Sequence, residues 1–375
     1  MATKKTDDKM GQSRQQIGKK IEEQATGIVA DIMKGAGPSI AIPVRGSRNV
    51  EFDKEKKKIV LGDKIAHRYL FNVGHARKFM QTMLVASYVK KDLLENNLTA
   101  TLRDLYYAKK HTIAGTKEDT IDDQKESDLA IVDFEVSLDT FREKLNLRAE
   151  PKGRMAGSVI IEDRVRNKVD SIDLSHMGSG GWAVPSIVEQ IEFKKVDVDY
   201  VLVAEKNAIF DRLNEDEYWA KNNCLIMTTA GQAARGARRL LQRLNEELKL
   251  PVYILTDADP YGWYIYSTMK YGSMALAHES DRLGCPNANF IGMSISDIEH
   301  YDLKAVTIKA KDVDIKRAEE MKKYDWFKAK EWQLEINKFL EKKIKAEIQS
   351  LSSKNLQYIS NTYLPEKINN KDFLP

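Results

Sequence analysis

Hydrophobic positions follow two different periods along this chain. Between residues 13 and 34 apolar side chains recur every three or four positions, which predicts one amphipathic helix. Three short apolar runs at residues 40–44, 49–52 and 58–61 are separated by turn residues and predict short strands. We therefore expect residues 1–68 to form an N-terminal extension with one helix and a small β element.

The helical period returns near residue 69. Residues 71–91 predict a long helix, which Asn96 and Asn97 interrupt. A second helix is expected to start after Thr99 or Thr101, because either threonine can cap a helix, and Asp104 would lie in its first turn.

The second helix of this pair is basic. It carries Arg103, Lys109 and Lys110. Two helices joined by so tight a turn indicate a helix-turn-helix, the second helix of which would face DNA. A plain helical hairpin with a charged face explains the same pattern equally well.

The chain then passes from helical to strand-like patterns. Residues 121–145 predict a further helix. Residues 158–161 and 169–172 predict two strands, which could form a β wing on the helices or begin the next sheet.

The second half of the chain has the pattern of an α/β domain. Apolar, β-branched runs at residues 198–204 and 252–255 predict buried strands, and residues 236–249 predict a helix that crosses between them. This order predicts a parallel β-α-β unit. Helices are also expected within residues 319–351, with these side chains in their core: Trp326, Phe327, Trp332, Leu334 and Phe339.

Two carboxylates follow the second of these strands. Asp257 and Asp259 are two positions apart, so in an extended chain their side chains point to the same side. Like charges this close are unfavourable unless a cation lies between them, and carboxylate oxygens suit Mg²⁺. The alternative is an ordinary turn, because Asp-x-Asp-Pro-x-Gly is also common turn chemistry.

A third carboxylate stands in the equivalent place after the first strand. Glu205 ends the run 198–204, and the carboxyl ends of parallel strands meet at one edge of the sheet, where ligands bind in open α/β folds. Glu205, Asp257 and Asp259 are therefore expected to share one site.

This arrangement resembles the Toprim domain of topoisomerases, some primases and related nucleases, in which one Glu follows a first strand and Asp-x-Asp follows a later one. The segment Thr-Leu-Arg-Asp-Leu-Tyr-Tyr, which ends at Tyr107, resembles the motif around the active tyrosine of the A subunits of DNA topoisomerase VI and of the related meiotic double-strand-break transesterases. The two motifs occur in that family's order.

The resemblance implies an α/β multidomain fold. A winged-helix domain with the catalytic tyrosine would span residues 69–152. A Toprim domain with a central, mostly parallel sheet would follow at residues 153–375, with its core at about 198–300.

The resemblance also implies roles for single residues. Tyr107 would be the nucleophile, Arg103 would stabilise charge beside it, and Glu205, Asp257 and Asp259 would hold Mg²⁺. Glu205 would also serve as a general acid or base, and the tyrosine of one protomer would work with the metal site of another.

Three further basic residues are candidate DNA contacts: Lys109, Lys110 and Arg238. The segment around Arg238 departs from the family, whose members more often have a Pro and a Ser or Thr before this arginine.

Helix geometry distinguishes Tyr107 from its neighbour. At about 100° per residue, with the helix extrapolated back to Leu98, the side chains of Leu98, Leu102 and Leu105 share one face, which we expect to be buried. Tyr106 lies at the rim of that face, whereas Tyr107 points away from Leu98. We therefore expect Tyr107 to be accessible to DNA.

Composition and the lack of certain motifs exclude several kinds of site and of protein. The 60 Lys and Arg residues nearly balance the 56 Asp and Glu residues, so net charge alone does not demand a nucleic-acid partner. The two cysteines form no zinc or disulfide pattern. No apolar run is long enough for a membrane span, and no secretory signal is recognisable at the start. We expect a cytoplasmic, DNA-associated protein.

The chain also shows no nucleotide-binding motif. The glycine-rich residues 177–182 lack the Lys-Ser/Thr of a P-loop. In the family, ATP is handled by a B subunit with a GHKL-type ATPase, so the resemblance implies an A2B2 heterotetramer that contains a homodimer of this chain.

The sequence thus predicts the DNA-cleaving component of an ATP-dependent type IIB topoisomerase, which breaks double-stranded DNA through a 5′-phosphotyrosyl intermediate. Two alternatives stay open at this point. One is a transesterase that cuts without strand passage, and the other is a non-catalytic winged-helix DNA-binding protein.

Overall fold

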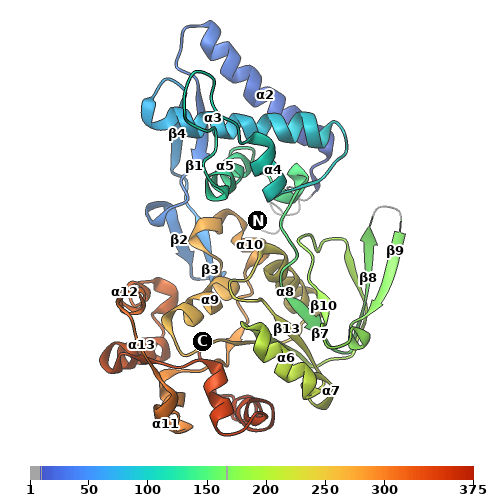
Figure 1. Ribbon diagram of the computed structural model, residues 1–375, viewed down its shortest axis with the longest axis vertical. Helices are drawn as coiled ribbons and strands as arrows, with labels where there is room; N and C mark the ends of the chain where they lie inside the picture. Colours follow the sequence, from blue (N-terminus) through green and yellow to red (C-terminus); the bar gives the residue numbers. More distant parts are fainter. Residues whose placement is uncertain (1–8, 10, 166–167) are drawn as a thin grey trace. The chain divides into compact units, whose positions relative to one another are not determined.

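The chain forms two compact units (Figure 1). The computed structural model describes residue 9 and residues 11–165 and 168–375. The first unit contains the described residues up to Glu51 together with Val60–Glu150. The second contains Phe52–Ile59 and Pro151–Pro375.

The first unit is mainly helical. Its helices and strands are α2 (Arg14–Met33), β1 (Ser39–Pro43), β4 (Ile65–Tyr69), α3 (Val73–Ser87), β5 (Ala100–Thr101), α4 (Leu102–Lys109), α5 (Gln124–Ser137) and β6 (Leu147–Arg148). The strands β2 (Val50–Asp53) and β3 (Lys58–Leu61) pair with each other, and their connecting end belongs to the second unit.

The predicted N-terminal helix is confirmed. Ser13 caps α2: its hydroxyl accepts from the Gln16 backbone, and the Gln16 side chain accepts from the Ser13 backbone. Ile17 and Ile21, one turn apart, are buried in a core that also contains Val85, Leu105 and Phe134. The helical spacing of apolar residues therefore places α2 on α3, α4 and α5.

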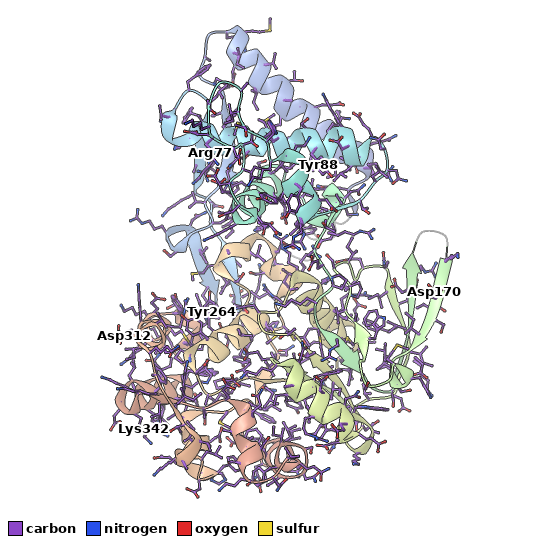
Figure 2. All side chains as sticks on the ribbon, in the orientation of Figure 1. Arg77, Tyr88, Asp170, Tyr264, Asp312 and Lys342 are labelled. Carbon is purple, nitrogen blue, oxygen red and sulfur yellow. The ribbon has the colours of Figure 1, made fainter. Side chains whose placement is uncertain are left out.

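The helix α3 does not run to residue 91 in regular form. It changes at Tyr88 into a π-helical segment that ends at Leu94. Arg77 of α3, labelled in Figure 2, donates to Glu126 of α5 at 3.0 Å between Nη2 and Oε2, and this contact joins the two helices. The same arginine is the main reason that the pKa of Glu126 is lowered.

The second unit is built on a six-stranded sheet in the order β10-β7-β13-β12-β14-β15. The strands β13, β12, β14 and β15 are parallel to one another, whereas β7 runs antiparallel to both of its neighbours, β13 and β10. The bounds are β7 (Arg154–Ala156), β10 (Trp182–Ala183), β12 (Tyr200–Ala204), β13 (Cys224–Thr228), β14 (Val252–Leu255) and β15 (Asn289–Phe290). The predicted central, mostly parallel sheet is confirmed.

The central strands are buried along their length. Val201, Leu202 and Val203 of β12 are fully buried, which is typical of a parallel strand with both faces covered. The helices of this part are α6 (Asn207–Glu215), α7 (Tyr218–Lys221), α8 (Arg235–Leu248), α9 (Pro260–Tyr271) and α10 (Ser280–Leu283). The predicted crossover helix is α8, between β13 and β14.

The strands predicted at 158–161 and 169–172 form neither a wing on the helices nor the start of the main sheet. They are β8 (Val159–Val165) and β9 (Lys168–Asp173), which form a separate three-stranded sheet with β11 (Ile191–Val196) (Figure 1). The expected helix at 121–145 is also shorter, because the chain turns at Asp139, which has a φ of 47°, and only a 3₁₀ turn follows.

The last part of the chain packs on the second unit. It contains α11 (Ile295–His300), β16 (Ile308–Lys309), α12 (Asp312–Met321), α13 (Lys330–Lys342), β17 (Ile344–Lys345) and α14 (Leu364–Asn369). The prediction of a core position is confirmed for Trp326, Phe327, Trp332 and Phe339, which are buried. It is wrong for Leu334, which is 53% exposed on the outer side of α13.

In the part of the chain that the structure describes, no helix combines the length and the apolar character that a membrane crossing would need.

Candidate active site

The tyrosine pair lies on a short, well-capped helix. α4 begins at Leu102, directly after Thr101. The Thr101 hydroxyl accepts from the Asp104 backbone N–H at 3.1 Å, and the Asp104 carboxylate accepts from the Thr101 backbone N–H at 2.7 Å. This reciprocal pair fixes the start of the helix and hence the direction of every side chain on its two turns.

Tyr107 is the exposed member of the pair. Its side chain is 68% exposed, whereas Leu105 is fully buried and Tyr106 is half-buried. The Tyr106 hydroxyl donates to the Asp122 carbonyl at 3.3 Å and accepts from Lys110 Nζ at 3.1 Å. The predicted outward position of the Tyr107 side chain is thus confirmed.

The predicted position of Leu98 is wrong. Its side chain is 57% exposed, because the backbone is extended at Ala100 and Thr101, where β5 pairs with β6, and the helical phase does not continue back to Leu98.

The basic side chains of α4 have different surroundings. Arg103 is exposed and makes a loose contact of 4.0 Å with Glu150, so its guanidinium is accessible to a phosphate. Lys109 lies over the ring of Tyr88, labelled in Figure 2, and 3.6 Å from Asp92. Lys110 is held by Tyr106 and lies 3.7 Å from Asp119.

We expect Thr101→Ala to destabilise the first unit by about 1 kcal/mol, the usual cost of losing a helix cap. Because the cap also fixes the direction of Tyr107, any reaction of the Tyr107 hydroxyl should slow by more than the loss of folded protein explains. Thr101→Ser, which keeps the hydroxyl, is the control. Thermal unfolding and the reactivity of Tyr107 measured on the same preparations check this prediction, and equal behaviour of the two variants would contradict it.

The second candidate site lies at the carboxyl ends of β12 and β14. Glu205 directly follows β12, and its backbone N–H donates to the Leu255 carbonyl at 3.0 Å. Its own carbonyl accepts from the Gly231 N–H at 2.7 Å, in the loop that leads to α8. Asp257 and Asp259 follow β14, so the predicted placement of all three carboxylates at this sheet edge is confirmed.

One carboxylate oxygen of Glu205 is available to a metal ion or another ligand. Its Oε2 is buried and has no hydrogen-bond partner among the described residues. Burial, followed by the charges of Asp257 and Asp259, raises the pKa of Glu205 to about 7. Glu205 thus offers a buried, unpartnered oxygen that feels the charges of Asp257 and Asp259, and carboxylate oxygens in such surroundings suit a hard divalent cation such as Mg²⁺.

Asp259 caps the helix that follows β14. Its Oδ1 accepts from the Gly262 backbone N–H at 2.7 Å and caps α9, whose first residue is Pro260. The Asp-Pro-x-Gly part of this segment is therefore the capped start of a helix and not a separate turn. A side chain at Gly262 would meet the Asp257 carbonyl at 2.8 Å, so only glycine fits in this first turn of α9.

Asp257 is held by residues that the sequence did not reveal. Its Oδ1 accepts from the Ile348 backbone N–H at 2.9 Å, and its Oδ2 pairs with Lys206 Nζ at 2.7 Å. Lys345 lies 3.9 Å from Asp259. Only the adjacency of Lys206 to Glu205 could have drawn attention to it, and no pattern marks residues 345–348.

Arg238 lies on the first turn of α8 and is almost entirely buried. Within the described chain its Nε and Nη2 have no hydrogen-bond partner. Burial lowers its pKa to about 10, which leaves the guanidinium charged at neutral pH. A buried cation with unused donors is suited to an anionic ligand.

Tyr107 and the three carboxylates belong to different units. The tyrosine lies in the first unit, and Glu205, Asp257 and Asp259 lie in the second. The helix α4 that carries Tyr107 lies wholly within the first unit, and the strands β12 and β14 that precede the carboxylates lie wholly within the second.

Three known families match consecutive parts of the chain. Residues 77–147 match the family described as "Type IIB DNA topoisomerase". Residues 150–197, which contain β8, β9 and β11, match "All-beta domain in DNA topoisomerase VI alpha subunit". Residues 200–368 match the Toprim domain shared by the A subunit of topoisomerase 6 and Spo11.

Whole proteins of similar sequence are A subunits of type 2 DNA topoisomerase 6. The one from Pyrococcus abyssi is 45% identical over 381 residues, which cover 99% of this chain and 98% of that protein. Those from Saccharolobus shibatae and Methanocaldococcus jannaschii are 42% and 38% identical. The first match covers 97% of this chain and of that protein, and the second covers 93% of each.

Proposed function

The chain belongs to the family of type 2 DNA topoisomerase 6 A subunits, and from this premise we propose that it cuts double-stranded DNA with Tyr107 as the nucleophile. The observation that carries the proposal is the exposure of Tyr107 on a helix fixed by the Thr101 cap, beside a half-buried Tyr106 that is already hydrogen-bonded.

In the proposed reaction the Tyr107 oxygen attacks a backbone phosphorus. The bond from phosphorus to the 3′ oxygen breaks, a 5′-phosphotyrosyl bond forms, and the tyrosine proton leaves as the 3′ oxygen gains one. Because one phosphate ester replaces another, the broken strand can be resealed by the reverse attack. Arg103, one turn before Tyr107 on α4, stabilises the charge that develops on the phosphate.

The proposed metal is Mg²⁺, held by Glu205, Asp257 and Asp259. When bound, it would neutralise phosphate charge and favour the departure of the 3′ oxygen. Glu205 is also the proposed general acid or base, as the family resemblance implies. Arg238, and the lysines Lys109 and Lys110, are proposed contacts to DNA phosphates.

We propose that the active form contains two copies of this chain, because a double-strand break needs two nucleophiles and a two-fold axis supplies them. Since no nucleotide-binding motif was found in the sequence, ATP hydrolysis is assigned to a partner with a GHKL-type ATPase in an A2B2 complex. This assembly would act on DNA inside the cell.

The chain alone is therefore expected to sediment as a dimer and to hydrolyse no ATP. ATP-dependent relaxation of supercoiled DNA should appear only when the ATPase partner is added. Analytical ultracentrifugation and a relaxation assay check this prediction. A monomer that still breaks both strands would contradict the proposed dimer. ATP hydrolysis by the chain alone would contradict its assignment to the partner.

A further inference from the structure

One ammonium group occupies the edge of the carboxylate cluster. Lys206, which directly follows Glu205, places its Nζ 2.7 Å from Asp257 Oδ2. The same Nζ lies 3.1 Å from Glu347 Oε2 and 3.2 Å from Gln349 Oε1. Lys206 therefore has three acceptors, one in the cluster and two in the segment after β17.

The backbone holds these two sets of acceptors in fixed register. Ala258, between the two aspartates, forms an isolated β-bridge with Ala346, with hydrogen bonds of 2.9 and 3.3 Å in the two directions. Ile348 donates its N–H to Asp257 Oδ1 at 2.9 Å. Glu347 lies between these two anchored residues, so its position relative to Asp257 is set by main-chain contacts and not by a flexible loop.

The positive charge of Lys206 offsets only part of the negative charge of the carboxylate cluster, which consists of Glu205, Asp257 and Asp259. Glu205 Oε2 is without a partner among the described residues, and Lys345, a second cation near Asp259, lies closer to Asp314 (3.0 Å) than to Asp259 (3.9 Å). An ammonium and a divalent cation cannot both lie against Asp257 Oδ2 without strong repulsion. Lys206, in contrast, can give up Asp257 and keep Glu347 and Gln349.

We infer that Lys206 is an exchangeable internal counter-ion of the carboxylate cluster, which a divalent cation displaces from Asp257 toward Glu347 and Gln349. The inference rests on the metal site proposed above. Lys206 thereby stabilises the metal-free protein and weakens metal binding, because part of the metal's binding free energy is spent on displacing it. Glu347 and Gln349 lower that cost because they accept the displaced ammonium.

The test is a calorimetric titration of the metal-free full chain with Mg²⁺, in the absence of DNA. Lys206→Met is expected to lower the Kd for Mg²⁺ at least about fivefold, the lower end of common couplings between two binding events. The metal-free variant should also melt at a lower temperature than the wild type. Lys194→Met removes the same charge from the three-stranded sheet, where Lys194 pairs with Glu162 and Glu192, and should leave the Kd unchanged.

Glu347→Gln tests the place to which the ammonium moves. In the wild-type background this variant should raise the Kd, because Lys206 loses an acceptor and stays with Asp257. In the Lys206→Met background the same change should have a much smaller effect, and the double-mutant cycle measures the difference. A Glu347 that acts on the metal only through its own charge would give equal effects in both backgrounds.

The possible failures are distinguishable. If the wild type binds Mg²⁺ but Lys206→Met binds it equally or more weakly, the counter-ion role is overturned. If Lys206→Met does not fold, as judged by circular dichroism, Lys206→Gln is measured against the same expectations. A wild type that binds no Mg²⁺ would overturn the proposed metal site and this inference together.

Discussion

Tyr107→Phe is expected to bind DNA like the wild type but to form no covalent adduct. The substitution removes one oxygen from a side chain that is largely exposed, so neither the core around Leu105 nor the Thr101 cap is disturbed. Loss of the nucleophile should lower cleavage by a factor on the order of 10⁴ or more. Gel shifts measure binding, and denaturing gels with mass spectrometry of the DNA-linked peptide measure the adduct, both with the ATPase partner present.

Tyr106→Phe is the matched control for this result. It removes the hydroxyl that donates to Asp122 and accepts from Lys110, so we expect a modest loss of stability and measurable cleavage. An adduct mapped to Tyr106 would overturn the assignment of Tyr107. The absence of any DNA-linked peptide from the wild type would instead favour a non-catalytic DNA-binding protein.

Glu205→Gln and Asp257→Ala should both lower Mg²⁺-dependent cleavage, on the order of 10²-fold or more, but they should change stability in opposite directions. Glu205 Oε2 is buried without a partner among the described residues, so a neutral side chain relieves repulsion in the metal-free protein. Asp257 is paired with Lys206 and the Ile348 N–H, so its removal leaves the Ile348 N–H without its acceptor and takes one of three acceptors from Lys206. The cost should be about 1–3 kcal/mol.

Denaturant unfolding in the presence of a chelator measures these stabilities, and cleavage at several Mg²⁺ concentrations measures the function. Glu162→Gln, on the three-stranded sheet, controls for the loss of one negative charge. Full cleavage by either Glu205→Gln or Asp257→Ala would show that the carboxylates do not serve the reaction. A large loss of stability in Glu205→Gln would contradict the interpretation that the charge of Glu205 destabilises the metal-free protein.

Local rules predicted the parts of the two sites that depend on neighbouring residues. Thr101 and Asp104 are three positions apart and form the cap, so the direction of Tyr107 followed from the helix that begins there. Glu205 and Asp257 each follow a run of buried residues, and the parallel order of β12 and β14 then brings them to the same edge.

Features that depend on distant residues were not predictable in this way. Asp257 and Glu347 are brought together by the bridge between Ala258 and Ala346, and nothing in the local pattern around residue 347 marks it. Alternation within β8 and β9 predicts strands but does not say which sheet they join. Leu98 was misplaced because two extended residues, Ala100 and Thr101, reset the helical phase before α4.

The second unit is discontinuous in the chain, and this affects the order in which it can fold during synthesis. Phe52 packs edge-on against Tyr271 with ring centroids 5.5 Å apart, and Lys58 donates to the Asp281 carbonyl at 2.8 Å. At about 5–20 residues per second, roughly 10 to 45 s pass on the ribosome between the appearance of Phe52–Ile59 and of these partners. The first unit can complete its own core in that interval, whereas Phe52 stays exposed to solvent and to chaperones until the Toprim segment emerges. A fragment that begins at Pro151 would lack these residues altogether, so Tyr271 would lose its aromatic neighbour.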